Sequence, residues 1–527
     1  MNLARLGRPK APRAAVLSPF VGAEQLRHGT LLRWGAGAFI LFYCIVTGFY
    51  FALMAPFVIV PFFVPVAILA GLVIWALPDM RNPPTRSLEL FYWIFLAALF
   101  IWPNYLAISL KGLPWITMIR LTGFPMLFLL LVCASTSEEF RSSVGRALRE
   151  TPLIWKLLVG FLVIQALSIG FSDSPALSLQ RLLVAQLTWT APFFICCYLF
   201  LRPGRVQIWA GVVLAVTAAV CAIGIWEFTV QKVPWAGHIP PFLRVEDEYV
   251  QRVLAGSMRD NRYRLQSTFS TSLSFAEYLA LVLPFALHFA IQPYRLVIRI
   301  IAAATVPISL FLVLESGSRL GLVGFLLAPT LYLASWAILR WRRDPGSLLA
   351  PSIALAYPAI FCAVIASTFF VGRIKMKVWG NGTQAASTQG RIDQYNAGIP
   401  KVLAEPWGHG PGMATETLGI SNQAGIASID TYYLLIALDY GIIGFLLYYG
   451  LILYAIYISS KFAFLSVGRA RDYALFTPIA ISLVTFFVIK SVFSQEGNHP
   501  LVFMMLGAIA ALVYRLRKED GALVAKS

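Results

Sequence analysis

The segment SIDTYYLLIALDYGIIGFLLYYGLILYAIYIS, residues 428–459, decides what kind of fold this chain has. Between Thr431 and Ser459 its one charged residue is Asp439. The run is longer than the ~20 apolar residues that cross the ~30 Å hydrocarbon core of a bilayer. A break in such a helix is possible where protein or water satisfies the hydrogen bonds of the non-helical backbone. We therefore expect one tilted transmembrane helix or a broken pair here.

Similar apolar runs recur along most of the chain. Hydrophobic residues make up 59% of the sequence, charged residues 13%, and the mean hydropathy is +0.74. A soluble domain has roughly a quarter charged residues, so the composition predicts an all-α polytopic membrane protein. About 14 transmembrane helices are expected, within a range of 12–14. The expected spans are 33–54, 57–77, 88–108, 113–134, 152–171, 178–201, 206–229, 272–291, 296–314, 319–339, 350–371, 430–459, 473–490 and 498–514. The first run is too long for a signal-peptide core and is expected to remain as a span.

Lysine and arginine mark alternate loops, and short loops rich in these residues remain cytoplasmic. The pattern places both termini inside, with two large periplasmic loops, of which the second should contain a short amphipathic helix. The expected parts are a basic N-terminal arm (1–32), N-terminal helices (33–230), a first periplasmic loop (231–271), central helices (272–371), a second periplasmic loop (372–428), C-terminal helices (429–514) and a cytoplasmic tail (515–527).

The formal charge of +18 is therefore largely topological, and we expect no nucleic-acid partner. Both large loops are nevertheless basic. Either long loops escape the charge rule, or an anionic, phosphorylated ligand binds at the outer face. The six cysteines lie in apolar runs and predict neither a disulfide framework nor a thiolate metal site. Glu246-Asp247-Glu248 fits a solvated loop face better than a cation site, so no metal is expected.

The second large loop carries most of the candidate chemistry. Apolar residues recur at helical spacing after Gly390, which predicts an amphipathic helix that ends at Pro406, with Arg391 in its first turn. The run Gly408-His409-Gly410-Pro411-Gly412 follows. It is either a plain turn or an anion-binding nest of backbone amides, in which Gly410 and Gly412 would face a phosphate.

Arginines recur at the outer ends of spans. Arg264 precedes a span that holds Glu277, and Arg319 follows Glu315-Ser-Gly-Ser318. Arginine binds phosphate through a fixed fork of donors and keeps its charge when it is partly desolvated. With Arg391 they form a candidate anion site, whereas each alone fits a snorkelling side chain. Arg120 and Arg181 lie within or at the edge of spans, and we assign them no role from their depth in the membrane.

Asp430 is the strongest candidate for a general base. If Ser428 caps the next helix, Asp430 falls in its first turn, where the helix dipole keeps a carboxylate ionised. Ordinary helix capping explains the same position. His409 and His499 are rival proton acceptors on the outer face, because histidine titrates near neutrality. Tyr432 and Tyr395 add possible glycan contacts, as do His499 and Glu277.

The order of these motifs resembles one known family. Thr268-Phe269, Ser316-Gly-Ser-Arg319-Leu-Gly, Gly390-Arg391, Pro406-Trp-Gly-His-Gly-Pro-Gly412 and Asp430-Thr-Tyr-Tyr-Leu434 are followed by Asp439-Tyr-Gly441-Ile-Ile-Gly444. The series, from about 264 to 445, is similar to the O-antigen ligase and polymerase superfamily of bacterial inner-membrane glycosyltransferases. The resemblance implies an undecaprenyl-diphosphate-linked oligosaccharide donor at the periplasmic face, no nucleotide sugar, no cofactor, and diphosphate contacts from Arg264, Arg319 and Arg391.

One departure narrows the expected activity. Asp430 stands where ligases that load O-antigen onto lipid A core typically carry histidine. The resemblance therefore favours a polymerase of exopolysaccharide or O-antigen repeat units over a ligase that acts on lipid A core or protein. A lipid-linked oligosaccharide flippase is the competing class, and a non-catalytic scaffold is a third. The expected partners are the lipid-linked oligosaccharide, the growing polysaccharide, membrane lipid, and chain-length or export proteins.

Overall fold

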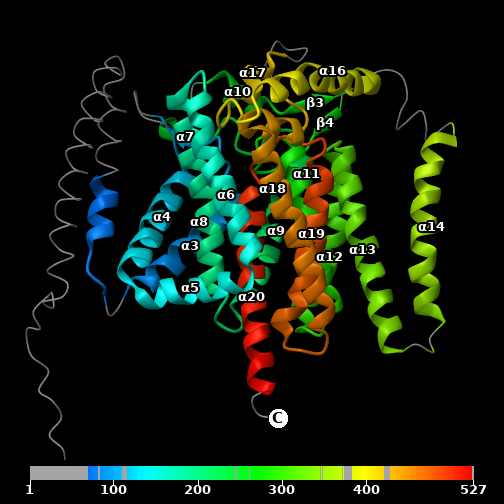
Figure 1. Cartoon of the computed structure of the whole chain (residues 1–527). Coiled ribbons are helices and arrows are strands. Elements are labelled where there is room, and N and C mark those ends of the chain that lie inside the picture. Colours follow the sequence, from blue (N-terminus) through cyan, green and yellow to red (C-terminus); the bar gives the residue numbers. More distant parts are fainter. Residues whose placement is uncertain are drawn as a thin grey trace, which may run out of the picture. The chain divides into compact units, whose positions relative to one another are not determined.

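The computed structural model describes residues 69–80, 83–109, 115–243, 245, 247–259, 262–344, 346, 348–370, 372, 383–420 and 428–524. Two compact units divide the chain: Met1–Val73 with Lys111–Leu113, and Ile74–Leu110 with Pro114–Ser527. Every labelled element in Figure 1 belongs to the second unit. The expected N-terminal arm and the span 33–54 lie outside the described residues, as does most of the span 57–77.

Helices build almost all of the second unit. They are α3 (Thr85–Ile101), α4 (Met118–Thr136), α5 (Glu138–Glu150), α6 (Pro152–Ser168), α7 (Pro175–Ala185), α8 (Ala191–Leu199), α9 (Arg205–Val230), α10 (Glu248–Ala255), α11 (Ser272–Ile291), α12 (Leu296–Glu315), α13 (Arg319–Arg343), α14 (Leu349–Phe370), α16 (Thr383–Ala404), α17 (Ala414–Leu418), α18 (Tyr432–Leu465), α19 (Phe476–Ile489) and α20 (His499–Val524). Two short antiparallel pairs complete it: β1 (Ala107–Ile108) with β2 (Ile116–Thr117), and β3 (Ser257–Arg259) with β4 (Arg262–Arg264).

The predicted class, an all-α membrane protein, is confirmed. Within the described ranges, ten helices are long and apolar enough to cross a membrane. The expected total of about 14 remains a prediction. Two expected spans turn out to be interrupted: a π-helical turn at Gln186–Thr190 separates α7 from α8, and Gly441 breaks α18 with φ 68° and ψ −176°. Of the two predicted forms of the 430–459 run, the broken one is observed.

Two helices form the centre of the second unit. The apolar window of α20 is 94% buried and that of α11 is 83% buried, whereas the corresponding windows of α12 and α13 are less than a third buried. A helix that is buried on all sides can carry apolar side chains around its whole circumference. α11 packs against α12, α13 and α19, and α20 packs against α8.

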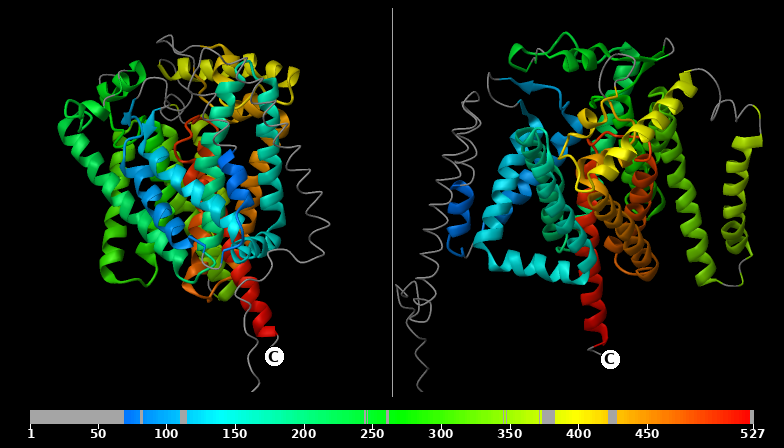
Figure 2. Two further views of the ribbon diagram at one scale, coloured as in Figure 1. Left: turned by 90° about the vertical axis from the view of Figure 1, so that its left-hand side faces the viewer. Right: turned by 45° about the horizontal axis from the view of Figure 1, so that its top comes forward.

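The segments that follow α9 and α14 gather at one end of the second unit (Figure 1). Figures 1 and 2 show α10, α16, α17 and the β3–β4 pair at this end, which we call the loop-bearing end, and α5 across the opposite end. Glu227, near the end of α9, holds the segment around β4 in place at this end. Its carboxylate accepts hydrogen bonds from the Tyr263 hydroxyl at 2.7 Å and from the amide of Gln266 at 3.1 Å. This bonding ties the strand that carries Arg264 to a membrane helix.

The predicted amphipathic helix exists as α16, which begins at Thr383 and ends before Pro406, so Arg391 lies about two turns into the helix and not in its first turn. Its apolar residues do not share one face. Val402 is buried, and an added Cβ at Gly398 would lie 2.8 Å from the Leu434 side chain, so this side packs on α18. Ile392, Ile399 and Leu403 are exposed. α16 therefore binds the protein on one side and presents an apolar stripe on the other.

Candidate functional site

The glycine-rich run 408–412 docks on the break in α18. The amide of His409 donates to the Leu438 carbonyl at 2.9 Å, and the amide of Gly410 donates to the Asp439 carbonyl at 3.0 Å. Any Cβ at Gly441 would lie 1.9 Å from the Pro406 carbonyl oxygen, so only glycine fits where loop and helix meet. The break in the helix and the glycine run are thus parts of one structure.

The Asp439 carboxylate holds the other half of this loop. It accepts hydrogen bonds from the amides of Gly412, at 2.9 Å, and Ala414, at 2.6 Å. The amides of Gly410 and Gly412, which were predicted to face a phosphate, therefore donate to Asp439 in this structure. Sequence reasoning assigned no role to Asp439, although a carboxylate inside an apolar run is a signal that it needs partners.

His409 is likewise engaged by the protein. Its Nδ1 lies 3.0 Å from the Leu438 carbonyl oxygen, which can only accept, so Nδ1 carries the proton. Its Nε2 lies 3.4 Å from Glu405 Oε2. The ring is mostly buried between these partners, which makes His409 a less accessible proton acceptor than Asp430.

Asp430 lies before α18 and not in its first turn, contrary to the prediction. The N-cap is Thr431, whose side chain forms no capping hydrogen bond. The reason is Gln394 of α16, whose amide oxygen accepts from the Asp430 amide at 2.9 Å and whose amide nitrogen donates to the Ser428 carbonyl at 3.1 Å. These bonds hold residues 428–430 outside the helix, so capping does not explain the aspartate.

Arg391 and Asp430 come together as neighbours. Arg391 Nε lies 4.0 Å from Asp430 Oδ2, and the Asp430 side chain is 43% exposed. A carboxylate with this exposure is reachable by a substrate hydroxyl. The pair joins α16 to the start of α18.

Arg264 lies beside the turn that leads into α13 and Arg319, at a second corner of the loop-bearing end. Arg264 Nε donates to the Ser316 carbonyl at 2.8 Å, and Ser318 caps α13 by accepting from the Gly321 amide at 3.1 Å. Arg319 is the first residue of α13 and is exposed. β4, α16 and the starts of α13 and α18 all lie at the loop-bearing end in Figure 1. The three predicted phosphate-binding arginines therefore share that end with Asp430.

Several predicted glycan contacts are buried in the protein core instead. Glu277 and His499 are both 0% exposed. Lys490 Nζ lies 2.8 Å from Glu277 Oε1, and His499 stacks on Trp189 with ring centroids 5.1 Å apart. Tyr395 is half-buried among the apolar residues under α16. In this structure these three side chains have structural partners, and Tyr432, the fourth predicted contact, is also 0% exposed.

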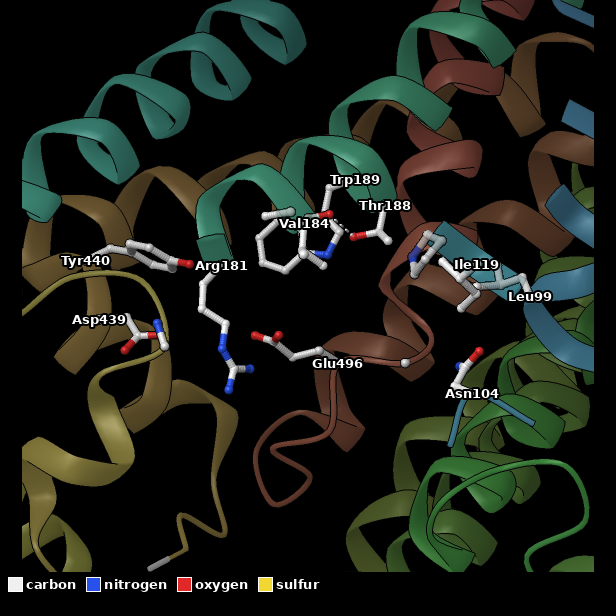
Figure 3. A pocket seen from close by; sticks show the side chains of 14 residues that line it. Leu99, Asn104, Ile119, Arg181, Val184, Thr188, Trp189, Asp439, Tyr440 and Glu496 are labelled. Carbon is white, nitrogen blue, oxygen red and sulfur yellow. Dashed lines mark hydrogen bonds between the residues drawn. The ribbon is translucent and has the colours of Figure 1, made fainter. Parts of the chain in front are cut away.

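A cavity of ≈ 220 Å³ opens beside the glycine run (Figure 3). Figure 3 shows the side chains of Arg181, Glu496, Asp439, Tyr440 and Trp189 around it. The full lining is Leu99, Asn104, Ile119, Arg181, Val184, Ala185, Thr188, Trp189, Gly412, Asp439, Tyr440, Glu496, Gly497 and Pro500. Of the predicted site residues, this lining includes Gly412.

Glu496 is the functional candidate that sequence reasoning missed. Its Oε1 accepts from the Tyr432 hydroxyl at 3.2 Å, and its side chain is exposed to the cavity. The protein around the cavity keeps Glu496 away from bulk water and so raises its pKa, and the charges of Lys490 and Arg181 lower it in part. A carboxylate just before an apolar run is the signal that would have pointed to it.

The described residues contain no group of three or more His, Cys, Asp or Glu side chains placed to hold a metal ion. Glu246 lies outside the described residues. Asp247 caps α10 by accepting from the Tyr249 amide at 2.9 Å, and Glu248 pairs with Arg252. These two carboxylates thus have local structural roles.

Comparison with known protein families gives one match. The model described as O-antigen ligase matches residues 304–449, a range that begins in α12 and ends in α18. The match confirms the resemblance to the O-antigen ligase and polymerase superfamily. It includes the glycine run, Asp430 and the break at Gly441. A search of curated proteins finds no match.

Proposed function

We propose that this chain is a polymerase of lipid-linked glycan repeat units, because residues 304–449 match the family model described as O-antigen ligase. It would join polyprenyl-diphosphate-linked oligosaccharides at the outer face of a bacterial inner membrane. The observation that carries this proposal is the exposed Asp430 carboxylate, held outside α18 by Gln394 and placed 4.0 Å from Arg391.

The chemistry needs two things from the protein. The diphosphate must be stabilised as it leaves the anomeric carbon, and the acceptor hydroxyl must lose its proton. Arginine forks can match the developing charge on the phosphate oxygens, a form of electrostatic stabilisation that is usually the largest catalytic contribution. Arg264, Arg319 and Arg391 are the candidates for this role.

Asp430 is the proposed general base. It would accept the proton of the acceptor hydroxyl while that oxygen bonds to the anomeric carbon, and the carbon–oxygen bond to the polyprenyl diphosphate would break. Direct attack inverts the configuration at that carbon. The products are a glycan longer by one repeat unit and free polyprenyl diphosphate.

Ligation of the glycan to lipid A core or to a protein is the alternative. The same donor site would serve either reaction, so the distinction depends on the acceptor. Asp430 in the place of the ligases' histidine favours polymerisation. The flippase alternative is less well supported, because the family model that matches this chain is described as O-antigen ligase.

The test is elongation by the purified full-length chain. Detergent-solubilised protein is mixed with its lipid-linked repeat unit, without nucleotide and with excess chelator, and the products are separated by length. We expect a ladder of longer glycans on the lipid carrier. Transfer onto added lipid A core without a ladder would assign the chain as a ligase, and no transfer to either acceptor would refute the proposal.

Orientation is tested separately. Single cysteines at Ser257 and Gly419 should react with a membrane-impermeant thiol reagent from the outer side, and one at Gly346 should not. Labelling of Gly419 only from the inner side would contradict transfer at the outer face.

A further inference from the structure

The cavity beside the glycine run differs in charge from the arginine-bearing corners. One cation, Arg181, and two carboxylates, Asp439 and Glu496, line it. We propose that this cavity binds one uncharged sugar ring of the repeat unit and so selects the glycan. This inference rests on the proposed function, because it assigns a subsite for that substrate.

The balance of charge disfavours a diphosphate in the cavity. A diphosphate is best matched by several cationic forks, and this lining supplies one guanidinium, Arg181. The Asp439 oxygens each already accept a backbone amide. The diphosphate therefore belongs with Arg264, Arg319 and Arg391.

The polar groups suit hydroxyls. Glu496 has one oxygen bonded to the Tyr432 hydroxyl, which leaves the second able to accept from a ligand. Figure 3 shows the Arg181 guanidinium and the Glu496 carboxylate directed into the same space, with Asn104 on the far side. Arg181 can donate hydrogen bonds, Glu496 can accept them, and the Asn104 amide can do both. Such a set can bind the hydroxyl groups of a sugar.

The apolar groups suit the faces of a sugar ring. Trp189 and Tyr440 line the cavity together with Leu99 and Ile119. Pockets for drug-sized ligands have volumes of about 300–1,000 Å³, and their walls are mostly apolar with a few placed polar groups. A cavity of ≈ 220 Å³ is smaller than these, so it would hold one ring of the glycan and not a chain.

The position of the cavity connects it to the proposed base. Tyr432, whose hydroxyl donates to Glu496, is the first residue of α18. Only the N-cap residue, Thr431, separates it from Asp430. The stem of Arg181 packs on Gly412, where an added Cβ would lie 2.9 Å from Arg181 Cγ. A sugar bound between Arg181 and Glu496 would contact the same helix start and loop that carry the transfer chemistry.

Most of the cavity residues used in this argument come from outside the family match. Arg181 and Trp189 belong to the α7–α8 region, and Glu496 to the segment between α19 and α20. Asp439 and Tyr440 lie inside residues 304–449. The matched domain would then supply the shared transfer chemistry, and these other segments the selection of the sugar.

The test measures binding without transfer. The probes are the free oligosaccharide released from its lipid carrier by mild acid, and inorganic pyrophosphate. Both are titrated by NMR into the purified full-length chain in detergent, for the wild type, Glu496→Gln, Arg181→Gln and the matched control Glu416→Gln. Glu416 is an exposed carboxylate of α17 that does not line the cavity.

We expect Glu496→Gln and Arg181→Gln each to weaken oligosaccharide binding about tenfold, the effect of losing a hydrogen bond to a charged group. Pyrophosphate binding should be unchanged in both, and Glu416→Gln should bind both probes as the wild type does. Glu496→Gln preserves the shape of the side chain and an acceptor for Tyr432, so a folded variant is expected.

Three results would overturn the assignment: no saturable oligosaccharide binding by the wild type, unchanged binding in both variants, or a loss of pyrophosphate binding instead. Failure of the proposed function looks different. A chain that binds the oligosaccharide through Arg181 and Glu496 but neither polymerises nor ligates it would refute the transferase and leave the sugar subsite standing.

Discussion

Lys490 with Glu277 and Arg181 with Glu496 are two cation–carboxylate sets with opposite surroundings. Lys490 and Glu277 are both 0% exposed and lie 2.8 Å apart. Arg181 and Glu496 are exposed to a cavity of ≈ 220 Å³ and face the same open space. The first set is closed by the protein, and the second has room for a ligand. The same two kinds of charge thus serve stability in one place and recognition in the other.

Their energetics should differ accordingly. A buried pair gains little over apolar packing, but removing one partner leaves a charge without compensation. Lys490 also lies 5.0 Å from the Tyr432 ring centroid and 5.2 Å from that of Phe486, so it is enclosed by protein. The cavity set has access to water or a sugar, and either can satisfy its polar atoms.

The largest effect on stability should come from Lys490→Met. It leaves Glu277 buried without its cation, and breaking such a pair costs about 3–5 kcal/mol. Thermal unfolding in detergent measures this loss. The double variant Lys490→Met with Glu277→Gln should recover much of the stability, because no buried charge remains. An unchanged melting temperature for Lys490→Met alone would show that the pair is not structural.

The next effect should come from Gly441→Ala, which tests the docking of the glycine run. The alanine would need a positive φ and would place its Cβ 1.9 Å from the Pro406 oxygen. Backbone strain of this kind costs of the order of 1–3 kcal/mol, and elongation should fall with the displaced loop. Gly450→Ala in the same helix is the control, because its Cβ meets nothing closer than 4.0 Å. Equal behaviour of the two variants would contradict the docking role.

A smaller effect is expected for Arg319→Lys and Arg391→Lys. Each keeps the cation but loses the fork that binds two phosphate oxygens, so KM for the lipid-linked donor should rise about tenfold per site. Oligosaccharide binding in the cavity should be unaffected. Arg340→Lys, at the far end of α13, is the control. Wild-type kinetics in both outer variants would remove these arginines from the donor site.

The smallest effect should come from an exposed pair at the opposite end. Arg517 Nη1 lies 2.6 Å from Glu150 Oε2, and the two side chains are 48% and 34% exposed. Exposed pairs contribute about 0–1 kcal/mol. Arg517→Ala should therefore shift the unfolding temperature little. A shift as large as that of Lys490→Met would refute the distinction between closed and open charge pairs.

The spans could be predicted because hydropathy depends on composition over about twenty residues. α11, α12 and α13 begin at residues 272, 296 and 319, where the apolar runs begin. The state of the 428–430 segment could not be predicted. Ser428 fits an N-cap locally, but Gln394 of α16 bonds to this segment from 34 and 36 residues away, and no local pattern reports such a bond.

The site was predictable where the chemistry is local to a motif. Arg264, Arg319, Arg391 and Asp430 were named from their own motifs, but the contacts of Arg264 with Ser316 and of Arg391 with Asp430 join residues 52 and 39 positions apart, and no local pattern predicted them. The cavity was not predictable, because Arg181, Asp439 and Glu496 lie in three different segments of the chain and no local pattern brings those segments together. The glycine run was ambiguous for the same reason: its amides bond to Asp439, which a sequence alone does not place beside them.

The most direct test of the central claim, that Asp430 is the base of a diphosphate-dependent glycan transfer, is single-turnover elongation by Asp430→Asn. The substitution preserves shape and removes the proton acceptor, so the rate should fall by about 10²–10⁴ while the lipid-linked donor still binds. Single repeat units should then accumulate on the carrier. Elongation by Asp430→Asn at the wild-type rate, with loss of elongation in His409→Ala, would contradict the account and move the base to His409.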